Sequence, residues 1–168
     1  MFSFGKKTVI GLDIGSSQVK AVELEPHGSN FRLRGFGFAL LPPEAIVQGS
    51  FMNAPAISAA ISEACAMGGF KSKDVVTSVS GHSVIVKRIT LPAQSKEELE
   101  ESIRWEAEQY IPFDINEVNL DHQILRESGV DGQMDVLLVA AKKDLIDDYV
   151  SVITEAGLSL LVMDVDAF

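Results

Sequence analysis

Apolar and polar positions alternate along the first part of the chain in a way that predicts a strand hairpin. Residues 9–14 read as one buried strand and residues 19–24 as its partner, separated by a short polar turn. A third strand is predicted over 31–41, after a polar turn at 26–30. Apolar residues then recur at helical spacing from Pro55 until Gly68 and Gly69, and the β-branched run 74–80 predicts a fourth strand.

A second pattern begins near residue 82. A strand is predicted over 82–91, and Ser95 with Glu98 forms a capping-box signature that opens a helix ending before Pro112. Strands over 118–126 and 133–142 follow, and then a helix over 144–156 that ends at Gly157. The run 158–165 predicts a last strand that returns to the first sheet.

These elements predict an α/β fold built from two interleaved parts. The order β-β-β-α-β of the first part resembles that of the opening half of a ribonuclease H-like domain. The second part, β-α-β-β-α, interrupts it. We therefore expect a first segment over 1–82, an inserted module over 83–156, and a return to the first domain over 157–168.

The polar turn between the first two strands has the composition of a phosphate cradle. Gly15 lets the backbone approach a bulky anion, and consecutive N–H groups in such a turn can form an anion-binding concavity. Asp13 would hold Mg²⁺ through water, because Mg²⁺ keeps most of its hydration shell. The candidate ligand residues are Asp13, Gly15, Ser16, Ser17, Gln18 and Lys20. An ordinary hairpin whose Gly and Ser satisfy the turn geometry is the alternative.

Composition excludes several classes of function. The chain has 168 residues and a net charge of −10, which argues against binding DNA or RNA because such binding depends on Lys and Arg. The single cysteine, Cys65, excludes a disulfide framework and suits the cytosol. The N-terminus lacks the apolar core of a signal peptide, so we expect a cytoplasmic protein.

The hairpin resembles the first phosphate loop of the actin, Hsp70 and sugar-kinase superfamily, which reads Asp-x-Gly-Ser/Thr. Here the motif is Asp13-Ile14-Gly15-Ser16, with Ser17 where actins have a second glycine. The inserted module resembles subdomain 1C of the FtsA-like branch, which would make the rest subdomain 1A. Four segments are similar to the PilM family of type IV pilus assembly proteins: MFSFGKKTVIGLDIGSSQVKAVEL, SGHSVIVKRITLP, EELEESIRWEAEQYIPFDINEVNLDHQIL and LLVMDVDAF.

The resemblance to PilM implies a cytoplasmic scaffold of pilus assembly. It implies ATP or ADP with Mg²⁺ bound between two lobes, and recruitment of the N-terminal cytoplasmic tail of PilN to a groove at subdomains 1A and 1C. It further implies contacts with the pilus motor ATPases and a peripheral location at the inner membrane through protein partners. Self-association stays open. Activity would be at most that of a weak ATPase in the full-length protein, and we expect this chain alone to be inactive.

The resemblance also bears on the end of the chain. Asp166 lies near the position where this fold has a water-positioning polar residue, and the alternative is the N-cap of a helix cut off at Phe168. We expect the second lobe, with its second phosphate hairpin, to be absent, so that nucleotide binding would be weak or missing in this chain alone. Two other functions fit the phosphate hairpin, an FtsA-like cell-division protein and a sugar-kinase-type phosphotransferase fragment.

Overall fold

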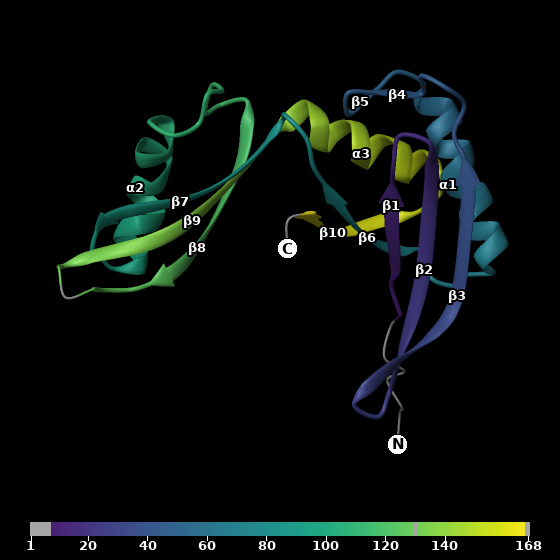
Figure 1. Cartoon of the computed structure of the whole chain (residues 1–168), viewed down its shortest axis with the longest axis horizontal. Helices are drawn as coiled ribbons and strands as arrows, with labels where there is room; N and C mark the ends of the chain where they lie inside the picture. The colour runs from purple at the N-terminus through teal and green to yellow at the C-terminus, as the bar shows by residue number, and fades with distance from the viewer. Residues whose placement is uncertain (1–7, 130, 167–168) are drawn as a thin grey trace. The chain divides into compact units, whose positions relative to one another are not determined.

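The computed structural model describes residues 8–129 and 131–166, and the chain divides into two compact units (Figure 1). The first unit contains the chain up to Gly81 and again from Asp147, and the second runs from His82 to Ile146. No helix in the described residues is long and apolar enough to cross a membrane.

The first unit is built on a mixed five-stranded sheet. Its strand order is β10 (Ser159–Val165), β6 (Asp74–Val79), β1 (Ile10–Ile14), β2 (Gln18–His27) and β3 (Asn30–Leu40). Strands β1, β2 and β3 are consecutive antiparallel neighbours, as the predicted hairpins require. Strands β6 and β10 instead run parallel to β1 and to each other, so β1 joins the antiparallel part of the sheet to the parallel part.

Helix α1 (Ala54–Gly68) packs against β2 and β3 on one face of this sheet. The Asn53 side chain caps the helix by accepting a hydrogen bond from the N–H of Ala56, and Gly69 ends it in the left-handed conformation with φ 64°. A Cβ on Gly37 would lie 1.9 Å from the carbonyl oxygen of Ala64, so α1 approaches the backbone of β3 too closely for any side chain there. A short hairpin that the sequence pattern does not predict, β4 (Ile46–Val47) and β5 (Ser50–Phe51), precedes α1.

The second unit is a three-stranded antiparallel sheet with one helix. Its strand order is β7 (Val84–Pro92), β9 (Gln133–Lys142) and β8 (Val118–Arg126), and its helix is α2 (Lys96–Glu108). The capping box of Ser95 and Glu98 is confirmed, since each donates a backbone N–H to the other's side chain. Alternate residues of the strands point into a core that the buried face of α2 covers. This core includes Ile89 and Leu91 of β7, Leu99, Ile103 and Ala107 of α2, and Met134, Val136, Leu138 and Ala140 of β9.

Helix α3 (Lys143–Glu155) differs from the expected division of the chain. We expected the inserted module to extend to residue 156, but the second unit ends at Ile146, so most of α3 belongs to the first unit. The reason lies in its contacts: Tyr149 stacks on Phe51 with ring centroids 4.7 Å apart, and Glu155 accepts a 2.9 Å hydrogen bond from Ser58 of α1. The inserted module is therefore β-α-β-β rather than β-α-β-β-α. The outer limits of the expected segments, residues 1 and 168, lie outside the described residues.

A buried carboxylate ties the three strands of the second unit together. Asp135 of the central strand β9 is 2% exposed and accepts hydrogen bonds from Arg88 and Thr90 of β7, at 2.8 and 2.9 Å. The guanidinium of Arg126 in β8 lies 2.9 Å from the same carboxylate. The hydrogen bonds from Arg88 and Thr90, together with the charges of the two arginines, hold the pKa of Asp135 below its usual 3.8.

We predict that Asp135→Asn lowers the thermal stability of the chain at neutral pH, because both arginines lose their shared partner. A carboxyl whose pKa is depressed by folding stabilises the protein above its unfolded-state pKa, and this contribution fades as the pH falls below it. The gap in Tm between the parent and the variant should therefore be constant from pH 5 to 7 and narrow below about pH 4. Thermal melts followed by circular dichroism test this, and an equal gap across the whole pH range would contradict it.

Candidate functional site

A hollow of about 560 Å³ lies within the first unit, on its sheet. Every strand of the sheet contributes to it, because its lining residues come from β1, β2, β3, β6 and β10. Apolar side chains form part of the lining, and polar ones come from every strand except β3. The lining residues are Gly11, Leu12, Asp13, Lys20, Ala21, Val22, Phe36, Val76, Thr77, Ser78, Val162 and Asp164.

Two of the predicted ligand residues line this hollow and contact each other. Asp13 of β1 and Lys20 of β2 are directly opposed in the antiparallel register. The Lys20 ammonium donates a 2.8 Å hydrogen bond to Oδ2 of Asp13, and the two side chains are 43% and 61% exposed, respectively. An exposed ion pair of this kind contributes little stability. Both charges are therefore available for exchange with a ligand.

The turn itself is a tight polar connection, as the sequence predicts. The Gly15 N–H donates a 3.1 Å hydrogen bond to the Gln18 carbonyl oxygen, and a Cβ on Gly15 would lie 3.2 Å from that same oxygen. Ser16 and Ser17 are exposed, and the Ser17 carbonyl oxygen accepts from the Leu41 N–H. The four residues from Gly15 to Gln18 adjoin the hollow in sequence but do not line it.

The parallel strands add polar residues that the motif does not include. Thr77, Ser78 and Asp164 line the hollow from β6 and β10. The Thr77 hydroxyl donates a buried 2.8 Å hydrogen bond to the Leu12 carbonyl oxygen, which fixes β6 beside β1. The signal that could have found Ser78 and Asp164 is their place near the carboxyl ends of strands parallel to β1, where α/β sheets commonly bind ligands.

The predicted candidate Asp166 follows β10, and its N–H donates to the Val79 carbonyl oxygen of β6 at 3.1 Å. It and Asp13 act on the same side chain, Tyr149 of α3. Burial raises the pKa of Tyr149 above its usual 10.0, and the negative charges of Asp13 and Asp166 raise it further. Nothing in the local sequence pattern singles out Tyr149. Whether Asp166 caps a following helix concerns positions outside the described residues.

The site fits a hydrated cation held by one carboxylate rather than a ligand cage. Among the described residues no group of three or more His, Cys, Asp or Glu side chains could hold a metal ion. Asp13 is largely exposed and accepts the hydrogen bond from Lys20 at only one of its two oxygens. A cation that keeps its water shell needs little more than such a carboxylate together with the phosphate oxygens of its ligand.

Comparisons with solved structures place this arrangement in a known class. The chain superposes on a structure described as a PilM-PilN type IV pilus biogenesis complex with a TM-score of 0.82 and 32% identity, over 95% of this chain and 47% of that one. It also superposes on the cytoplasmic domain of EpsL, an inner membrane component of the type II secretion system of Vibrio cholerae. That match has a TM-score of 0.59 and 12% identity, covers 94% of this chain and 57% of the other, and so shows a shared fold alone. The class is thus a mixed α/β fold found in pilus and secretion components.

The sequence narrows this class to one family. The profile of the family described as type IV pilus assembly protein PilM matches residues 11–168. The chain belongs to the PilM family of type IV pilus assembly proteins. It spans about half the length of the PilM structure that it matches.

We predict that removing either carboxylate lowers the pKa of Tyr149. In a Tyr110→Phe background Tyr149 is the sole tyrosine, so absorbance during an alkaline titration reports it alone. Asp13→Asn and Asp166→Asn should each lower its pKa without restoring the usual value, because burial is the larger cause. Asp164→Asn is the matched control and should change nothing. If neither Asp13→Asn nor Asp166→Asn moved the titration, the two carboxylates would not share this site.

Proposed function

We propose that this chain is the nucleotide-sensing and partner-binding part of a PilM-type scaffold in type IV pilus assembly. One observation carries the nucleotide part of the proposal: an exposed Asp13–Lys20 pair at a hydroxyl-bearing hairpin, beside a hollow of about 560 Å³. Membership of the PilM family supports the assembly role. The similar structure's description as a PilM-PilN complex supports a PilN-type partner.

The proposed nucleotide chemistry follows from the charges. When a phosphate group enters, Lys20 exchanges Asp13 for a phosphate oxygen, since an anion competes directly for the ammonium. Asp13 is then left to hold the water shell of Mg²⁺, which neutralises phosphate charge when it is bound. The exposed hydroxyls of Ser16 and Ser17 and the backbone of Gly15 and Gln18 adjoin the same end of the hairpin and supply further donors.

The same geometry favours conformational control over rapid turnover. Phosphoryl transfer needs a nucleophile and a phosphate clamped from several sides. This chain supplies the hairpin on one side and Asp166, whose charge like that of Asp13 raises the pKa of Tyr149, as the residue that could orient a water. We therefore assign it at most a weak ATPase activity, with ADP and ATP setting the state of the scaffold.

The partner part of the proposal is a short cytoplasmic tail of a PilN-type membrane protein. Such a tail would bind in extended form, because a strand edge supplies main-chain hydrogen bonds and neighbouring pockets supply specificity. The scaffold would act in the cytoplasm, reach the inner membrane through that partner, and link it to the pilus motor ATPases.

We predict that Asp13→Ala weakens Mg²⁺-ATP binding by about tenfold or more in a PilM-length protein that carries this sequence, because a charge-assisted contact to the cation shell is lost. Isothermal titration calorimetry with and without Mg²⁺ measures it. Glu108→Ala serves as a control, since it removes an exposed carboxylate of the second unit that does not line this hollow. Equal affinities for the parent and Asp13→Ala would refute the nucleotide assignment.

We further predict saturable binding of a synthetic PilN-type N-terminal tail, measured by fluorescence anisotropy, with a scrambled peptide as the control. The peptide should bind this chain, because the match to the PilM-PilN complex covers 95% of it. If neither this chain nor a PilM-length parent bound the tail in preference to the scrambled peptide, the partner assignment would be wrong.

A further inference from the structure

Strand β8 of the second unit has one edge without a neighbour. The sheet order β7-β9-β8 places it outermost, and no strand of the described residues pairs with its other side. The His122 N–H is instead bonded at 2.8 Å to the side chain of Asp121, its neighbour in β8. In natural proteins, Lys or Pro residues commonly prevent an edge strand from pairing with another chain. The opposite edge strand, β7, contains Lys87 and Pro92. The nine residues of β8 contain neither, which leaves this edge open to pairing.

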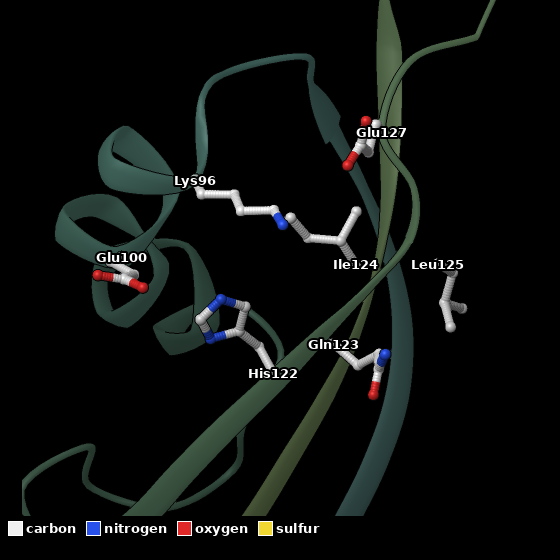
Figure 2. A pocket seen from close by; sticks show the side chains of 7 residues that line it. All are labelled: Lys96, Glu100, His122, Gln123, Ile124, Leu125 and Glu127. Atoms are coloured by element: carbon white, nitrogen blue, oxygen red, sulfur yellow. The ribbon is translucent and has the colours of Figure 1, made fainter.

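A hollow of about 360 Å³ runs along this same edge. Lys96 and Glu100 line it from the first turns of α2 (Figure 2). From β8, His122 and Ile124 point toward the helix, whereas Gln123 and Leu125 point away from it (Figure 2). The hollow thus includes side chains from both faces of β8. An added strand, whose side chains alternate between the two faces, would contact both sets.

The charged groups that line the hollow are exposed to solvent. Within the described part of the chain, the side chains of Lys96, Glu100, His122 and Glu127 make no hydrogen bond or ion pair. The lining thus contains two carboxylates and one ammonium, and the first turns of α2 add Glu97 and Glu101 nearby in sequence. Leu125 is 50% exposed and offers an apolar contact. The ligand that complements this lining is basic as well as apolar.

We propose that the free edge of β8 binds an extended peptide of another protein, with alternating apolar and basic side chains, as a fourth strand of the sheet. The β8 backbone supplies the hydrogen bonds of strand addition. Glu100 and Glu127 select the basic side chains, while Leu125, on the face of β8 that points away from α2, receives the apolar ones. This site lies wholly in the second unit, so it does not depend on the proposed nucleotide site, whose hollow lies in the first unit.

The test uses the 168-residue chain and two blocked probe octapeptides, one alternating valine with lysine and the other valine with glutamate. In ¹⁵N NMR titrations the valine–lysine peptide should shift the amide signals of β8 and protect them from hydrogen exchange. Anisotropy of the labelled peptide gives the Kd. The double variant Glu100→Gln with Glu127→Gln should weaken binding by about fivefold or more, since two exposed charge pairs are lost.

Two further variants test whether peptide binding depends on the edge of β8 or only on the overall charge of the chain. Leu125→Lys places a positive charge beside the β8 edge and should weaken binding to a similar degree. Glu108→Gln removes an exposed carboxylate from the last turn of the same helix, away from the hollow, and should leave the Kd unchanged. Equal binding of the two probes, equal loss in Glu108→Gln and the double variant, or shifts confined to residues outside β8 and α2 would each overturn the proposal.

Discussion

The position of β1 is the constraint on which the first unit depends. This strand pairs antiparallel with β2 on one side and parallel with β6 on the other, so it joins a local hairpin to a long-range crossover. The buried hydrogen bond from Thr77 to the Leu12 carbonyl oxygen holds the parallel side. Because β1 is fixed on both edges, its last residues can turn sharply at Gly15 and still present Asp13 and Lys20 on one face.

The second unit is organised by a different interaction. Asp135 lies on the central strand and binds groups from both outer strands, so the three strands share one buried carboxylate. Losing any one partner would leave a buried charge without compensation, so the three strands are held in the register that brings these groups together. A small sheet with one helix can in this way keep a defined pairing while leaving the edge of β8 free.

Elements with a strong local signal were predicted closely. Strands β8 and β9 coincide with the predicted 118–126 and 133–142, and the capping box of Ser95 and Glu98 formed as expected. The short hairpin β4–β5 was not predicted, because two-residue strands leave no periodicity to read. The boundary at residue 156 was wrong because α3 has the same apolar spacing whichever unit it packs against. Only its contacts with Phe51 and Ser58 show that most of α3 belongs to the first unit.

The sequence by itself determined the hairpin, the tight turn at Gly15 and the choice of Asp13 and Lys20 as its charged residues. All of these depend on neighbours within a few positions of one another. Only the tertiary structure decided that these residues lie beside Thr77, Ser78 and Asp164, and that Asp13 and Asp166 act on one buried tyrosine. These residues come together through parallel strand pairing and helix packing, in which the partners are far apart in the chain, and no local pattern of residues records such contacts.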